Sequence, residues 1–238
     1  MIAEPAATAT GTLPPLWRVR DMVSAFCVVV LSFAALGLLI AATAQRGEGI
    51  NPAGATAIIA FNLLLVATVL LLATRRGITA ADLGFVRPRV WGPLAIAWAG
   101  AYVILICYVA AIALLEALGL SVDAFKGTNT IDFDHDRVVL VLALGIATIV
   151  GAPFSEELLF RGLLHRGLRG YWRPLPAMSL SGALFSVFHL NLGVLVPFAF
   201  IGALWAWAYE ESGSLWTTIA AHAGVNSVAF IATLLFLE

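Results

Sequence analysis

Long apolar runs separated by short polar stretches dominate the chain. Most of these runs reach the roughly 20 residues that a helix needs to cross about 30 Å of hydrocarbon. The runs at 175–190 and 193–210 are short, so we expect them to be tilted, packed inside a bundle or only partly spanning. The pattern predicts an all-α, polytopic membrane helix bundle of seven helices, or eight if one run is broken, at residues 22–44, 53–74, 91–117, 137–159, 175–190, 193–210 and 214–237.

Composition supports a membrane protein. Of the 238 residues, 61% are hydrophobic and only 11% are charged, whereas a soluble domain carries about 25% charged residues. The chain therefore has too few charges to cover a soluble surface, and its main partner is expected to be the lipid bilayer. The net charge is -1 and there is no basic tract, which argues against binding to nucleic acid.

Arginines in the connecting stretches predict the orientation. Residues 75–90 and 161–173 each carry four arginines, whereas residues 121–136 carry four aspartates against Lys126. The excess of Lys and Arg on cytoplasmic loops places both Arg-rich stretches in the cytoplasm, and Arg18 and Arg20 place the N-terminus there as well. We expect an integral protein of the cytoplasmic membrane.

The acidic stretch divides the chain into parts of different character. Residues 1–16 are rich in Ala, Thr and Pro and are expected to form a flexible tail, without the basic start of a signal peptide. Residues 17–120 would form the N-terminal membrane helices. The unusual polar residues all lie in 137–238, which is therefore the expected catalytic core.

Glu156, Glu157 and Arg161 interrupt an apolar run. Ionisable groups inside a membrane segment are costly and are functional hypotheses by default. Adjacent helix residues point about 100° apart, while residues four apart share a face, so Glu157 is expected to pair with Arg161. Glu156 then remains free, and burial would raise its proton affinity toward that of a general base or acid. Alternatively, all three residues only join helices together.

His189 is predicted to lie at the depth of Glu156. A turn is expected at Trp172-Arg173-Pro174, because the residue before a proline avoids the helical conformation. Glu156 lies sixteen residues before Trp172, and His189 lies sixteen after Arg173. Two antiparallel helices would place both side chains about 24 Å from the turn. A lone histidine on an apolar helix is, however, more often a packing residue.

His222 and Asn226 form a third polar pair, four residues apart on one helix face. Gly224 between them permits close approach by a neighbouring helix. The pair is either part of a reaction site or an interhelical hydrogen-bond pair without chemistry. The spacing does not fix the depth of His222.

These residues suit hydrolysis in two ways. Glu156, His189 and His222 could ligate zinc and leave one position for water, as catalytic zinc sites do. Alternatively, Glu156 and His189 activate water without a metal, while His222 and Asn226 donate hydrogen bonds to the developing oxyanion. Zinc is therefore a possible cofactor.

Three motifs occur in order: EExxxR at 156–161, FxxxH at 185–189 and HxxxN at 222–226. Together they resemble the CPBP family of intramembrane proteases, the CAAX-processing and bacteriocin-processing group also called ABI, over roughly residues 140–230. The stretch Asp82-Leu83-Gly84-Phe85 also resembles a short motif that precedes the core in that family.

The resemblance implies a membrane protease, commonly of eight helices, with a four-helix catalytic core. By motif position, Glu156 corresponds to the water-activating glutamate and His189 to the first catalytic histidine. The second histidine and the asparagine correspond to His222 and Asn226. The supporting residues would be Glu157, Arg161 and Phe185. Family members are described both as metalloproteases and as metal-independent glutamate proteases, so both mechanisms stay open.

The expected function is an intramembrane endopeptidase, CAAX-protease-like, that hydrolyses a peptide bond in a membrane-associated, lipidated or unlipidated, protein or peptide. The alternative is a non-catalytic membrane protein of the same fold, such as an immunity or scaffold factor that binds a peptide or partner. An ion-coupled carrier is disfavoured, because the chain lacks paired interrupted helices at matching positions.

Overall fold

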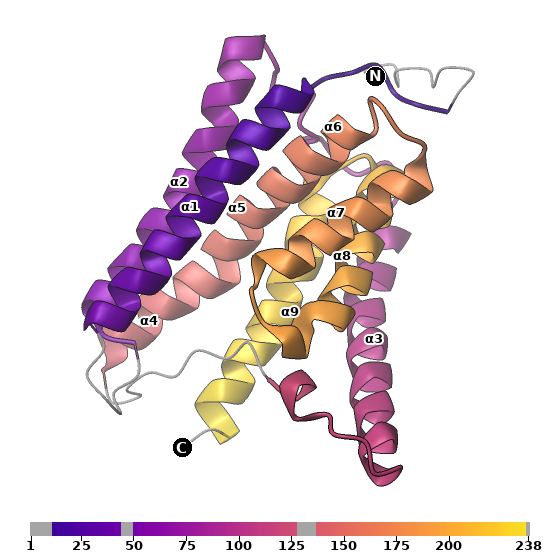
Figure 1. Cartoon of the computed structure of the whole chain (residues 1–238). Helices are drawn as coiled ribbons and strands as arrows, with labels where there is room; N and C mark the ends of the chain where they lie inside the picture. The colour runs from indigo at the N-terminus through magenta and orange to yellow at the C-terminus, as the bar shows by residue number, and fades with distance from the viewer. Residues whose placement is uncertain (1–10, 44–49, 128–136, 237–238) are drawn as a thin grey trace.

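A computed structural model describes residues 11–43, 50–127 and 137–236. Within these ranges the chain forms helices and no strand (Figure 1), which confirms the all-α prediction. A short 3-10 turn, Asp123–Phe125, follows the third helix. The main helices are α1 (Val19–Thr43), α2 (Pro52–Arg76), α3 (Gly92–Ala117), a composite fourth helix, α7 (Pro174–Phe188), α8 (Leu192–Ser212) and α9 (Leu215–Phe236).

The composite fourth helix runs from Val138 to Leu168 without a loop. It alternates between α-helical and wider π-helical geometry, in which hydrogen bonds span five residues. Its segments are α4 (Val138–Ile146), η2 (Ala147–Gly151), α5 (Ala152–Glu157), η3 (Leu158–His165) and α6 (Arg166–Leu168).

Six of the described helices are long and apolar enough to cross a membrane, and α7 is shorter. The predicted count of seven or eight is thus approximately met by seven helical segments. The short length expected at 193–210 is wrong, since α8 extends to Ser212 and reaches 21 residues. The shortness expected at 175–190 is confirmed by the 15 residues of α7.

The stretch 161–173 is not the loop that its arginines suggested. The fourth helix continues nine residues beyond the predicted end at 159, and Arg161 is fully buried. The helix continues because the charge of Arg161 is compensated internally, as described below. Only the end of this stretch forms the predicted turn, where Arg173 has an extended backbone and α7 begins at Pro174.

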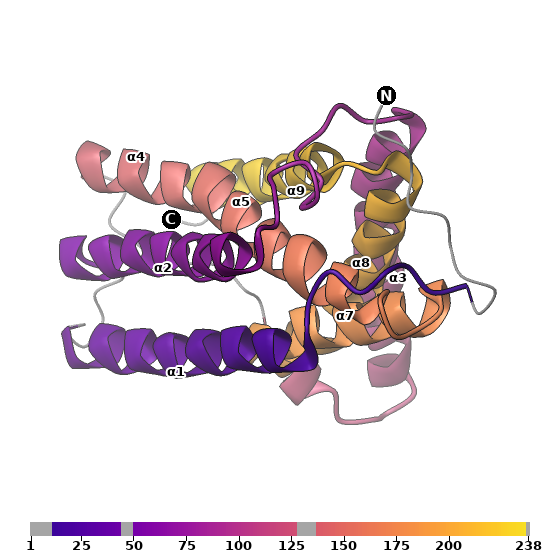
Figure 2. The ribbon, with the colours of Figure 1, turned by 90° about the horizontal axis from the view of Figure 1, so that it is seen from above.

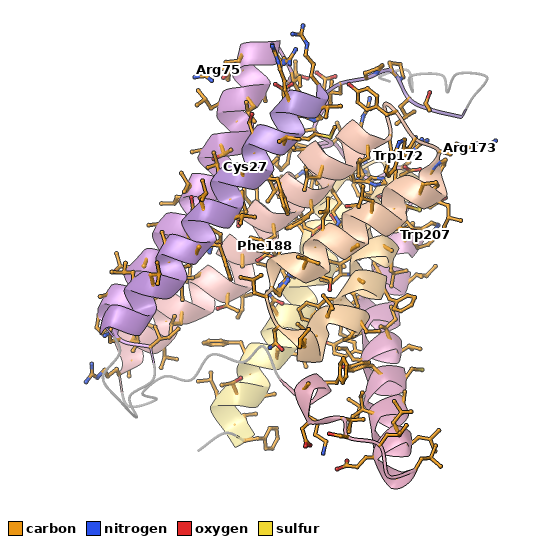
Figure 3. The ribbon with its side chains drawn as sticks, viewed as in Figure 1. Cys27, Arg75, Trp172, Arg173, Phe188 and Trp207 are labelled. Atoms are coloured by element: carbon orange, nitrogen blue, oxygen red, sulfur yellow. The ribbon has the colours of Figure 1, made fainter. Side chains whose placement is uncertain are left out.

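The helices form two groups joined by the composite helix. Seen from above, α1, α2 and α4 lie in a row, whereas α3, α7 and α8 gather on the other side of α5 (Figure 2). Arg75 and Arg173 lie at the same end of the bundle (Figure 3). This shared end agrees with the prediction that the two Arg-rich stretches lie on the same side of the membrane. Asp132, Asp134 and Asp136 of the acidic stretch lie outside the described residues.

An aromatic cluster joins the two groups. Phe188, at the C-terminal end of α7 (Figure 3), lies 5.1 Å from Phe33 of α1 and 6.1 Å from Phe61 of α2, measured between ring centroids. Phe160 of η3 lies 5.4 Å from the same ring. Such edge and stacked contacts add to the free energy of apolar burial.

Two asparagines from neighbouring helices bind the first π-helical segment. Asn62 of α2 donates its amide to the Ala147 carbonyl at 3.2 Å, and Asn226 of α9 donates to the Thr148 carbonyl at 2.9 Å. The Asn62 amide oxygen also accepts from Ser155 at 3.0 Å. In a membrane, backbone carbonyls need partners inside the protein, so these side chains stabilise the irregular helix.

Replacing Asn62 with Ala should therefore destabilise the bundle. The change removes two interhelical hydrogen bonds and leaves Ser155 and a buried carbonyl with fewer partners, at a cost of about 1–3 kcal/mol. The measurement is the thermal unfolding midpoint in detergent. Thr68→Ala is the control, because the exposed Thr68 hydroxyl bonds only within α2. Equal midpoints for the two variants would contradict the anchoring role.

Candidate active site

Glu157 is the centre of a buried ion group. Its Oε1 accepts a hydrogen bond from Arg161 Nη1 at 2.8 Å and another from His222 Nδ1 at 2.9 Å. Glu157 and Arg161 are both fully buried, and Arg161 Nη2 also donates to the Gly202 carbonyl of α8 at 2.9 Å. The Glu157–Arg161 pair predicted from the four-residue spacing is thus confirmed, and it connects three helices.

Two aromatic side chains surround this ion group. The Arg161 guanidinium lies 4.9 Å from the centroid of Phe185 and 5.5 Å from that of Trp205, within the range of cation–π attraction. Trp205 also lies against His222, with ring centroids 4.3 Å apart, and donates its indole N–H to the Ala97 carbonyl at 3.2 Å. Sequence reasoning missed Trp205, because an aromatic residue in an apolar helix gives no separate signal.

His189 directly follows the last residue of α7, and its hydrogen bond defines the tautomer of its ring. Its Nδ1 lies 2.8 Å from the Phe185 carbonyl; a carbonyl only accepts, so Nδ1 carries the hydrogen. In a neutral ring Nε2 is then an acceptor. The next residue, Leu190, has a φ of 48°, a left-handed conformation that is strained for leucine. The chain thus turns sharply directly after the histidine.

Glu156 differs from its neighbour as the sequence predicted. Its Oε2 is buried and accepts no hydrogen bond from the described residues. The Oε2 of Glu157 is likewise buried without a hydrogen-bond partner among the described residues, although its Oε1 has two. A buried carboxylate oxygen without a donor is costly. The free acceptor on Glu156 suits a water molecule or a polar substrate group.

Arg161 links the candidate residues electrostatically. Its charge acts on Glu156, Glu157, His189 and His222. The described residues include no hydrogen bond between Glu156 and His189, so their direct meeting stays a prediction.

The Asn226 side chain forms its hydrogen bond with another helix and not with His222. Its amide donates to Thr148 as described above, rather than to the histidine one turn earlier. Gly224, between the two, is a close-approach position: a Cβ there would lie 2.7 Å from the Trp98 indole nitrogen of α3. The close helix contact predicted at Gly224 is confirmed.

The residues do not form the zinc set considered from the sequence. No group of three His, Cys, Asp or Glu within the described ranges lies close enough to hold a metal ion. Glu156, His189 and His222 therefore do not fit a three-ligand zinc site in this arrangement.

A second buried polar group lies at the end of the composite helix. His165 Nε2 is 3.0 Å from Glu210 Oε1 of α8, and Arg169 donates to the same oxygen. Sequence reasoning placed Arg169 in a loop and missed His165. The signal was the spacing of four residues from Arg161, which continues the face that carries Glu157.

The Asp82–Phe85 motif fastens a loop to the turn between α8 and α9. Leu83 O accepts from Tyr209 at 3.2 Å, and Gly84 O accepts from the Leu215 amide at 2.8 Å. Gly84 has a φ of 95°, and a Cβ there would lie 2.7 Å from the Tyr209 ring. Both the backbone conformation and the lack of space therefore favour glycine at this position. Phe85 packs on Phe154, with centroids 5.6 Å apart.

Residues 138–228 match the family model described as type II CAAX prenyl endopeptidase Rce1-like. The resemblance to the CPBP family is confirmed. The matched segment contains the composite helix, α7, α8 and most of α9, with all three motifs. It supports a protease-type function in an integral membrane protein. Comparisons with curated proteins and with solved structures gave no match.

Arg161→Ala should destabilise the helix bundle strongly, because it leaves Glu157 buried without its main counter-charge. Breaking a buried pair in this way costs about 3–5 kcal/mol. The measurement is folded yield and thermal midpoint in detergent, with the exposed Arg75→Ala as control. The double variant Glu157→Gln/Arg161→Met should regain part of the lost stability. A midpoint for Arg161→Ala equal to the control would contradict the pairing.

Proposed function

We propose that this protein is an intramembrane endopeptidase in which Glu156 and His189 activate water. The observation that carries the proposal is the unequal use of two neighbouring carboxylates. Arg161 and His222 both bind Glu157 through its Oε1, while neither of them binds Glu156, whose buried Oε2 has no hydrogen-bond partner among the described residues. A purely structural role would need only the Glu157 carboxylate.

The free acceptors suit a water molecule that donates two hydrogen bonds, one to Glu156 Oε2 and one to His189 Nε2. The water oxygen then attacks the peptide carbonyl carbon, and its proton passes to Glu156. When the tetrahedral intermediate collapses, the C–N bond breaks and Glu156 returns the proton to the leaving amine. Positioned general bases of this kind contribute about 10²–10⁴-fold to rates.

His222 and Asn226 would stabilise the oxyanion. The Nδ1–H of His222 is directed at the Glu157 carboxylate, so His222 would donate to the substrate from Nε2 only as a doubly protonated ring. Asn226 uses one amide hydrogen for Thr148 and retains another. Glu157, Arg161 and Phe185 hold these groups in place. Fixed donors aimed at developing charge are a large catalytic contribution.

The substrate would be a membrane-associated protein or peptide, lipidated or unlipidated. The arginines of 75–90, with Arg18 and Arg20, favour an N-terminus in the cytoplasm, and the protein would then lie in the cytoplasmic membrane. The scissile bond would enter the bundle from that membrane.

Glu156→Gln should reduce cleavage at least about 100-fold and leave the thermal midpoint unchanged. The probes are a fluorescence-quenched peptide with a farnesylated cysteine followed by three residues, and the same peptide without farnesyl. Membranes of cells with wild type and with Glu156→Gln would also be compared for released peptides. Glu211→Gln is the control, because Glu211 is an exposed carboxylate.

Retained cleavage in Glu156→Gln would remove Glu156 from the mechanism. Identical peptides from the two cell types, together with no cleavage of either probe, would instead favour a non-catalytic member of the same fold.

Metal removal provides a second test. Because no three-ligand group is assembled among the described residues, we expect chelator-treated protein with no zinc by elemental analysis to keep its activity. Loss of cleavage on chelation, restored specifically by added zinc, would contradict the metal-independent mechanism.

A further inference from the structure

Residues 11–17 form a strap across the end of the composite helix. The Leu13 amide donates to the Arg169 carbonyl at 2.8 Å, and Arg169 Nη1 donates to the Gly11 carbonyl at 3.0 Å. Arg166 Nη1 donates to Pro14 O at 3.2 Å. Residues 11–16, expected to belong to a flexible tail, are therefore docked on the core, whereas residues 1–10 lie outside the described part.

Trp17 ends the strap and reaches deepest into the core. It is only 1% exposed, and its indole N–H donates to the Gly162 carbonyl at 2.9 Å. The Trp17 carbonyl accepts from the Tyr171 hydroxyl at 3.2 Å. The tryptophan is thus held by the composite helix through Gly162, 145 residues away in sequence, and by Tyr171 in the turn that follows that helix.

The helix fits closely against this side chain. A Cβ at Gly167 would lie 3.3 Å from Trp17 Cβ and 2.3 Å from Met22 Sδ. A larger residue at Gly167 would therefore force the Met22 side chain to move and would crowd Trp17. Since α6 directly continues η3, this packing leaves little freedom for the end of the composite helix to shift along its axis relative to α1.

The hydrogen bond falls at a position that matters for the ion group. Gly162 directly follows Arg161, whose guanidinium binds both Glu157 and the Gly202 carbonyl. It lies in the π-helical segment Leu158–His165. π-Helical geometry is rare compared with the regular α-helix, so such a segment depends on contacts with its surroundings. A fixed donor on one carbonyl stabilises one register of the helix.

We propose that Trp17 is a positioning residue for the active site. By holding Gly162, it fixes the π-helical register that directs Arg161 at Glu157, and through Glu157 it sets the orientation of His222. The proposal rests on the proposed protease function. It assigns a role in the reaction to a residue outside the matched segment 138–228.

The test is Trp17→Phe, which keeps the aromatic bulk and removes only the donor. We expect kcat on the cleaved probe to fall about tenfold with KM within about twofold, because small misplacements of reacting groups cost rate rather than binding. Amide hydrogen exchange of residues 158–168 should accelerate in the substrate-free protein. Trp91→Phe is the matched control, since Trp91 is 57% exposed.

An unchanged kcat in Trp17→Phe would overturn the positioning role even if exchange accelerates. Unchanged exchange would overturn it regardless of cleavage. If wild type cleaves neither probe and releases no peptide, the protease proposal fails, but accelerated exchange confined to Trp17→Phe would still support the anchoring of η3. The failure of one proposal is therefore distinguishable from the failure of the other.

Discussion

A carboxylate with no access to water governs the architecture of the matched segment, residues 138–228. Glu157 is stable inside an apolar bundle only because Arg161 and His222 both bind its Oε1. Desolvating these charges is expensive, and the cost is offset only when the geometry and the additional hydrogen bonds are good. The ion group therefore requires the composite helix, α8 and α9 to keep one arrangement. It also relieves Glu156 of any pairing role.

Irregular helix geometry follows from the same requirement. The π-helical segments lie on either side of Glu156 and Glu157, and side chains from other parts of the chain bind their carbonyls. Asn62 and Asn226 bind the first segment, and Trp17 binds the second. In a bilayer these donors must come from protein, so Asn62 and Trp17, which lie outside the motifs, contribute to the shape of the site.

The sequence predicted much of the fold because membrane length and hydropathy constrain it strongly. The turn at Arg173 followed from proline, and the Glu157–Arg161 pair followed from helical spacing. The helix through Arg161 was missed, because hydropathy treats a paired charge as a free one. The partnership of His222 with Glu157 joins residues 65 apart, and Trp17 and Trp205 carry no pattern. Counting residues from the turn assumed a regular α-helix, which η3 is not.

The most direct measurement is an experimental structure of the Glu156→Gln protein with an uncleaved peptide bound. We expect the scissile carbonyl to lie beside residue 156 and His189, with its oxygen toward His222 and Asn226, while Glu157 keeps both of its partners. A peptide that contacts Glu157 in place of Arg161, or that binds away from residue 156, would contradict the division of roles between the two carboxylates.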